Sequence, residues 1–172
     1  MSSNFLKKQL ELVRFEKTID YVTASAGGRK HLNSSELAHI NSMLTLTPTE
    51  VWRSEPVTVK LPFGDKNFSM ITNYQIQAQE IISKARDEAN NGDLAQAAAK
   101  IYADLVLNHL FIDANRRTAV AAASWILMEH GVTIQAMGLL ELGAGDLSEP
   151  KQFQALKQVI QYSIDVSRSR DD

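Results

Sequence analysis

One ten-residue segment constrains the fold of this chain more than any other. Residues 119–128 read Ala-Val-Ala-Ala-Ala-Ser-Trp-Ile-Leu-Met, which is apolar on nearly every side of a helix. Such a helix lies buried at the centre of a protein, and small alanine side chains let neighbouring helices approach it closely. The 172 residues suffice for a packed core without metals or disulfides, and the chain has no cysteine. We therefore expect a helical protein built around this segment.

Apolar periodicity, capping residues and turn residues place further helices on both sides of this segment. A second helix is expected to start at Asn33, Ser34 or Ser35, and Asp93 is expected to cap another. The expected ranges are 5–24, 33–44, 73–90, 93–110, 115–129, 134–142 and 150–167, with Pro48 closing the second region, a turn at 143–145 and a frayed tail at 168–172.

Residues 51–71 have a different pattern. Apolar and polar residues alternate at 57–60, and the stretch from Gly64 to Asn67 has the composition of a turn. We expect a β-hairpin here, kept at an edge by Pro56 and Pro62, as the single β element of an all-α chain. The sequence predicts one domain, with N-terminal helices at 1–47, the hairpin at 50–70, a core at 72–130 and C-terminal helices at 132–168.

The charge balance excludes some classes of function. Eighteen basic residues face twenty acidic ones, giving a formal net charge of −2, whereas general nucleic-acid binders carry a basic excess. No window approaches the roughly 18 unbroken apolar residues that a membrane span needs, and the first residues do not resemble a secretory segment. We expect a soluble, cytoplasmic protein that binds neither nucleic acid nor membranes.

The segment 109–118, His-Leu-Phe-Ile-Asp-Ala-Asn-Arg-Arg-Thr, contradicts the simple rules of helix composition. Arg116 and Arg117 lie in the first turn of the buried helix, where the unpaired N–H groups and the helix dipole repel cations. The conflict disappears if an anion such as a phosphate binds there. Asp113 just upstream is a ligand type that Mg²⁺ uses beside substrate phosphates, and His109 is able to act as a general base.

Each of these residues also has an ordinary structural explanation. An isolated histidine at a helix end is usually structural. Asp113 could cap the helix, and the two arginines could extend to solvent or pair with surface acids. Their joint spacing at the start of a buried helix favours the functional interpretation.

The run from His109 to Arg117 resembles the signature of the Fic/Doc family, H-x-F-x-[D/E]-[G/A]-N-x-R. Upstream, residues 52–59 resemble the R-x-x-x-V-x-[I/V] run that forms the target-docking flap of the Fic branch, at the place where composition predicts the hairpin. The resemblance implies a Fic-type helical core with one small hairpin flap. It covers about residues 50–130.

The resemblance implies a role for each matching position of the loop. His109 would deprotonate a Ser, Thr or Tyr hydroxyl of a target protein. Asp113 would hold Mg²⁺ on the phosphates of ATP, and Arg117 would contact the distal phosphates. Asn115 would form an anion hole together with the backbone N–H groups of Ala114 to Arg116.

The resemblance also implies roles outside the phosphate site. Phe111 would anchor the loop in the core. The flap residues Val57, Thr58, Val59 and Lys60 would pair main chain to main chain with a segment of the target, a β-augmentation that tolerates varied sequences.

Departures from the family pattern leave the reaction open. Arg116 occupies the position where the AMP-transferring branch usually has glycine and the Doc branch, which phosphorylates a protein, usually has lysine. The flap and the chain length resemble Fic, so AMP transfer is the first interpretation and γ-phosphate transfer the second. A catalytically inactive helical adaptor is a third, with Arg116 blocking the cradle, and a DNA-binding regulator is disfavoured by the net charge.

Many Fic enzymes carry an inhibitory helix with the pattern [S/T]-x-x-x-E-[G/N], whose glutamate pairs with the last arginine of the signature. No glutamate of this chain has Ser or Thr four residues before it. The resemblance therefore suggests an antitoxin partner that supplies the inhibitory glutamate in trans.

Overall fold

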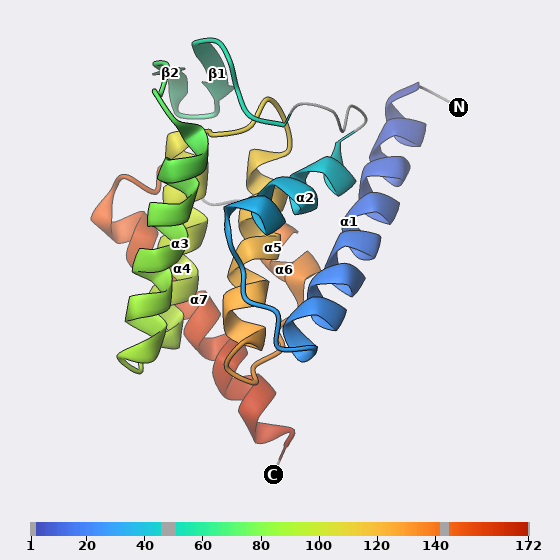
Figure 1. Cartoon of the computed structure of the whole chain (residues 1–172), viewed down its shortest axis with the longest axis vertical. Helices are drawn as coiled ribbons and strands as arrows, with labels where there is room; N and C mark the ends of the chain where they lie inside the picture. Colours follow the sequence, from blue (N-terminus) through green and yellow to red (C-terminus); the bar gives the residue numbers. More distant parts are fainter. Residues whose placement is uncertain (1–2, 46–50, 142–144, 172) are drawn as a thin grey trace.

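The computed structural model describes residues 3–45, 51–141 and 145–171, and within them it contains seven helices and one two-stranded sheet (Figure 1). Pro48 and the first two residues of the expected turn at 143–145 lie outside the described residues. The elements are α1 (Ser3–Gly27), α2 (Ser34–Leu44), β1 (Val57–Leu61), β2 (Gly64–Phe68), α3 (Tyr74–Asn90), α4 (Leu94–Asn108), α5 (Asn115–Met128), α6 (Ala136–Glu141) and α7 (Pro150–Ser169).

Helix α5 forms the core of the molecule, which confirms the prediction from its composition. Every residue from Thr118 to Leu127 is buried, and Trp125 is fully enclosed. Helices α1 and α2 lie on one side of α5 and α4 lies on the other, with α3 packed outside α4 (Figure 1). The apolar face of α7, with Leu156, Ile160 and Ile164, packs against α4.

Short polar side chains fix where several helices begin. Asn33 accepts a hydrogen bond from the backbone N–H of Glu36 at 2.9 Å, and Asp93 accepts one from Gln96 at 2.9 Å. These caps satisfy N–H groups that have no partner inside the helix. Asp93 was predicted as a cap, and Asn33 was one of three residues predicted for the start of α2. The last helix is longer than predicted, because α7 continues to Ser169 into the expected frayed tail.

The hairpin pairs β1 with β2 in antiparallel register, from Val57 opposite Phe68 to Leu61 opposite Gly64. The turn lies at Pro62 and Phe63, so the prediction of a turn at residues 64–67 was wrong. Gly64 has a φ of 125°, which glycine adopts without the cost that other residues pay, directly after the turn. The polar residues after it belong to β2, because an exposed strand accommodates polar side chains.

A second β interaction was missed by sequence reasoning. Trp52 forms an isolated antiparallel bridge with Phe111, the residue at the middle of the loop before α5. This bridge and the hairpin lie at the end of the bundle where α4 finishes and α5 begins (Figure 1).

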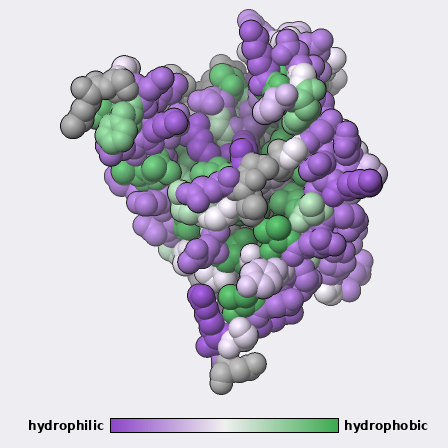
Figure 2. Space-filling view, turned by 180° about the vertical axis from the view of Figure 1, so that it is seen from behind, coloured by the Kyte–Doolittle hydropathy of each residue, from purple (hydrophilic) through white to green (hydrophobic). Residues whose placement is uncertain are grey.

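The back of the molecule has a mostly hydrophilic surface, with hydrophobic side chains gathered toward its middle (Figure 2). Among the described residues, no helix combines the length and apolar character needed to cross a membrane.

Candidate active site

The loop between α4 and α5 has an unusual backbone at both ends. His109 has φ 49° and ψ 57°, and Ala114 has φ 58° and ψ 25°, so both lie in the left-handed region. A residue with a Cβ atom is disfavoured in this region. Such conformations persist where surrounding contacts enforce them, and they concentrate at functional sites.

Main-chain pairing and aromatic stacking hold the loop in place. Ile112 donates its N–H to the carbonyl of Val51 at 3.0 Å, across the bridge between the two segments. The ring of Phe111, 1% exposed, stacks on Trp52 with centroids 4.8 Å apart. Phe111 therefore lies behind the loop in the core, where the sequence analysis placed its anchor.

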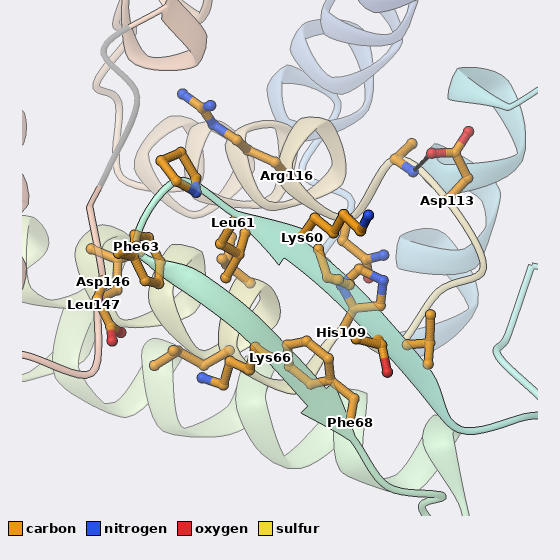
Figure 3. Close-up of a pocket in the computed structure, with 18 of the residues that line it drawn as sticks. Lys60, Leu61, Phe63, Lys66, Phe68, His109, Asp113, Arg116, Asp146 and Leu147 are labelled. Carbon is orange, nitrogen blue, oxygen red and sulfur yellow. Dashed lines mark hydrogen bonds between the residues drawn. The ribbon is translucent and has the colours of Figure 1, made fainter.

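A cavity of about 930 Å³ lies in front of the loop. Its walls come from the hairpin, the loop, the start of α5, the end of α4 and the turn before α7 (Figure 3). The structure brings to this cavity all the sequence-predicted site residues except Phe111, namely Val57, Thr58, Val59, Lys60, His109, Asp113, Ala114, Asn115, Arg116 and Arg117.

His109 faces the cavity between the loop and the hairpin. Its ring stacks on that of Phe68, with centroids 4.9 Å apart and planes inclined by 27°. Burial lowers the pKa of His109 below its usual 6.5, the positive charge of Arg53 lowers it further, and the carboxylate of Asp113 acts in the opposite direction. The imidazole is therefore neutral at pH 7, as a general base must be.

The start of α5 presents backbone N–H groups to the cavity. The first main-chain hydrogen bond of the helix joins the N–H of Thr118 to the carbonyl of Ala114 at 2.9 Å. The N–H groups of residues 115–117 come before that bond, so they have no acceptor within the helix. With the dipole of a buried helix behind them, these N–H groups have the arrangement that suits an anion.

The side chain of Asn115 is engaged within the loop. Its amide oxygen accepts the N–H of Phe111 at 3.0 Å, and its amide nitrogen donates to the carbonyl of Phe111 at 2.9 Å. Asn115 therefore shapes the loop through its side chain, in addition to placing its backbone N–H at the helix start. Sequence reasoning missed this role because the partner depends on the left-handed backbone around it.

The two arginines point to different places. Arg117 is largely buried, donates to the carbonyl of Leu44 at 3.4 Å, and lies 3.8 Å from a carboxylate oxygen of Asp113. Arg116 donates through Nε to the hydroxyl of Tyr102 at 3.1 Å and through Nη2 to the carbonyl of Leu140. Its side chain leads away from the two strands of the hairpin (Figure 3). Both guanidinium groups have partners in the protein.

Asp113 is the one carboxylate in the loop. Its side chain is 71% exposed, and Oδ1 accepts the N–H of Ala114 at 2.6 Å (Figure 3). The cap position of α5 belongs to Ala114, which has no side-chain capping bond. A single carboxylate beside a cavity fits Mg²⁺, because this ion usually completes its shell with water and substrate phosphates. Among the described residues, no group of three or more His, Cys, Asp or Glu gathers as a complete metal site.

Arg53 is a residue of the site that the sequence analysis did not name. It is 5% exposed and donates to the carbonyl of His109 at 2.9 Å. The only sequence signal was its place at the start of the R-x-x-x-V-x-V run before the hairpin. Burial of its guanidinium follows from how the hairpin folds onto the loop.

Comparison with known proteins gives a consistent result. The model of the Fic/DOC family matches residues 31–127, which include the hairpin and the loop. No curated protein matches the chain. Among solved structures, a Fic domain containing signaling protein from Bacteroides thetaiotaomicron has a TM-score of 0.66 at 15% identity, covering 91% of this chain and 68% of that one.

Two further similar structures contain the protein IbpAFic2. The first, covalently tethered to Cdc42, has a TM-score of 0.63 at 20% identity over 88% of this chain. The second, in complex with adenylylated Cdc42, has a TM-score of 0.60 at 19% identity over 77%. This chain spans 49% and 45% of those two chains. At these identities the likeness concerns the fold.

Proposed function

Since this chain belongs to the Fic/DOC family, we propose that it is a Fic-type transferase that moves AMP, or another nucleoside monophosphate, from a nucleotide to a hydroxyl of a target protein. One observation carries the proposal: His109, neutral at pH 7, shares a cavity with the N–H groups at the start of α5 and with the hairpin. The proposed base, the proposed anion site at the start of α5 and the hairpin strand that would pair with a target peptide therefore all line the same cavity.

Each group has a role in the proposed reaction. His109 accepts the proton of a target Ser, Thr or Tyr hydroxyl, whose oxygen attacks the α-phosphorus while pyrophosphate leaves. Phosphoryl-centre transfer depends mainly on positioning and on stabilisation of negative charge. The N–H groups of residues 115–117 and the guanidinium of Arg117 supply that stabilisation. Asp113 would hold Mg²⁺, and this ion would neutralise part of the negative charge of the phosphates.

The contacts of Arg116 favour AMP transfer over γ-phosphate transfer. Its guanidinium is bound by Tyr102 and by the carbonyl of Leu140, so it does not extend over the N–H groups at the helix start. The cradle then stays open, as in the branch with glycine at this position. One similar structure holds adenylylated Cdc42, and that product is in keeping with the same chemistry here.

Mass spectrometry of intact target proteins tests the reaction. Incubation with ATP and Mg²⁺ is expected to add about 329 Da, whereas a kinase would add about 80 Da. The variant His109→Ala should fold normally and lose at least about a hundredfold in rate, because a general base contributes about that much. Transfer by this variant within tenfold of the natural rate would remove His109 from the role of base.

Titration calorimetry separates the enzyme from the inactive adaptor. We expect heat of binding when ATP and Mg²⁺ are added to the unmodified protein. An adaptor with a blocked cradle would give no heat.

We also propose that an antitoxin partner inhibits this enzyme by placing a glutamate against Arg117. The guanidinium of Arg117 lies beside the cavity, and its protein contacts are a long hydrogen bond of 3.4 Å and an ion pair of 3.8 Å, which a second carboxylate could replace. Co-expression with the product of each neighbouring gene should identify one that lowers both transfer and ATP affinity. Unchanged activity and affinity with every one of them would contradict this proposal.

A further inference from the structure

Arg53 is a buried cation that has no carboxylate partner among the described residues. Its side chain is almost fully enclosed, and none of the ion pairs formed by the described residues includes it. The guanidinium carbon lies 5.4 Å from the ring centroid of Tyr74, a cation–π contact that offsets part of the loss of water. Removing a charge from water is costly, so a buried guanidinium without a carboxylate partner points to a role beyond packing.

Four carbonyl oxygens from three segments of the chain accept hydrogen bonds from the guanidinium of Arg53. Nε donates to His109 at 2.9 Å, and Nη1 donates to Glu55 at 2.7 Å, just before β1, and to Phe68 at 3.1 Å. Nη2 donates to Ser69 at 2.9 Å, just after β2. A single planar group therefore joins both ends of the hairpin to the residue that carries the imidazole.

The hairpin touches His109 a second time through Phe68. The carbonyl of Phe68 accepts from Arg53, and its ring stacks on the imidazole at 4.9 Å. His109 itself has the left-handed backbone at the end of α4, and the bond from Arg53 to its carbonyl holds that conformation. The direction of the imidazole is thus fixed relative to the hairpin, and not only relative to α4.

We infer that Arg53 is a positioning residue that locks His109 to the hairpin, so that a target segment paired with the hairpin has its hydroxyl aligned with the base. This inference rests on the proposed function. Lysine cannot replace arginine here, because one ammonium group cannot span acceptors on three segments as the planar fork does.

The charge of Arg53 also acts on His109. Burial and the positive charge of Arg53 both lower the pKa of the imidazole, whereas the negative charge of Asp113 raises it. The other charged residues that line the same cavity are Lys60, Lys66, Arg116, Arg117 and Asp146.

Two variants separate the geometric effect from the electrostatic one. Arg53→Lys keeps a positive charge but loses the fork, so kcat for target modification should fall about tenfold or more while KM for the target changes less. Arg53→Met loses both, so the pKa of His109 should rise toward 6.5. NMR titration of labelled histidines measures that pKa in the unliganded protein, with His109→Gln used to assign the signal.

Arg86 in α3 provides the matched control. It also donates to a main-chain carbonyl, that of Leu32 at 2.7 Å, and it does not line the cavity. Arg86→Lys and Arg86→Met should lower the Tm, as loss of a partly buried arginine does, and leave kcat and the pKa of His109 unchanged.

Specific results would overturn the inference. Arg53→Lys with the natural kcat would show that the fork is not needed. An unchanged pKa of His109 in Arg53→Met would show that its charge does not act on the imidazole. If Arg53→Met fails to fold, Arg53→Lys tests the inference through two measurements, its kcat and the rate of amide hydrogen exchange in its hairpin. Loss of the Arg53 contacts should make the hairpin amides exchange faster than in the natural protein, and an unchanged kcat and exchange rate would contradict the inference. If no nucleotide supports transfer, the proposed function fails, while the titration and the amide exchange still test the lock.

Discussion

At the scale of single residues, the site depends on polar side chains that bind main-chain carbonyls. Arg53 holds the carbonyl of His109, and Asn115 holds that of Phe111, each at 2.9 Å. Carbonyls that accept these hydrogen bonds are less available to repel phosphate oxygens. The imidazole of His109, the carboxylate of Asp113 and the residues at the start of α5 line the cavity. The N–H groups at the helix start, together with the guanidinium of Arg117, make the site suited to an anion.

The pH dependence of transfer follows from the pKa of His109, which burial and the charge of Arg53 hold below 6.5. A base acts only when neutral, so kcat/KM should be constant near pH 7 and fall as the pH drops through the lowered pKa. The midpoint of that fall is expected below 6.5 in a rate profile measured with a constant-ionic-strength buffer. A midpoint at or above 6.5 would contradict the assignment.

Arg117 and Lys60 line the same cavity and carry the same charge, but only Arg117 lies beside the helix start. Arg117→Ala should weaken ATP binding about tenfold or more, because a guanidinium binds phosphate oxygens through two parallel hydrogen bonds. Lys60→Ala, on the hairpin, should have a smaller effect. Calorimetry with ATP and Mg²⁺ measures both, and equal losses would remove Arg117 from the cradle.

At the scale of elements, the loop before α5 is fixed by three neighbours: the strand-like segment at Trp52, the hairpin, and α2. The contribution of α2 comes from Asn41, which is fully buried. Its amide nitrogen donates to the carbonyl of Asp113 at 2.9 Å and to the hydroxyl of Thr118 at 3.0 Å. One amide thus ties α2 to both sides of the left-handed turn at Ala114.

Replacing Asn41 tests how much this tie stabilises the fold. Asn41→Ala leaves the part-buried carbonyl of Asp113 and the buried hydroxyl of Thr118 without their donor, so the free energy of unfolding should fall by about 2 kcal/mol. The control is Asn91→Ala at the exposed end of α3, where the change should stay within about 0.5 kcal/mol. Urea denaturation of both variants measures the difference. Equal, small losses would show that water replaces the bonds of Asn41.

At the scale of the whole molecule, α5 serves as both the core and one wall of the cavity. Its alanines at 119 and 121–123 are fully buried, which allows α4 and α1 to pack closely against it. The N-terminus of the same helix opens into the cavity. The proposed anion site is therefore built on a buried helix that is packed on several sides, as a site that depends on positioning requires.

Ala122→Leu tests the close packing around α5. The added atoms have no space in a tightly packed core, so the free energy of unfolding should fall by about 1–3 kcal/mol. Ala155→Leu on the exposed face of α7 is the matched control and should change it by less than about 0.5 kcal/mol. Chemical denaturation provides the measurement. An equally small effect at position 122 would indicate a void beside α5.

Sequence alone determined the local features of this protein: the helices, most of their caps, the buried character of α5 and the segment at 109–117, most of which lines the cavity. These follow from patterns within a few residues, because periodicity and capping are local effects. The position of the hairpin turn was misjudged, since turn composition and exposed-strand composition are alike.

The tertiary structure alone decided which distant groups meet. Arg53 and His109 are 56 residues apart in the chain, and Asn41 and Asp113 are 72 apart, yet each pair is joined by a hydrogen bond. The direction of Arg116 toward Tyr102 and the engagement of Asn115 within the loop also depended on how the helices pack. Such contacts arise from the three-dimensional arrangement of whole elements, and no short-range pattern in the sequence encodes them.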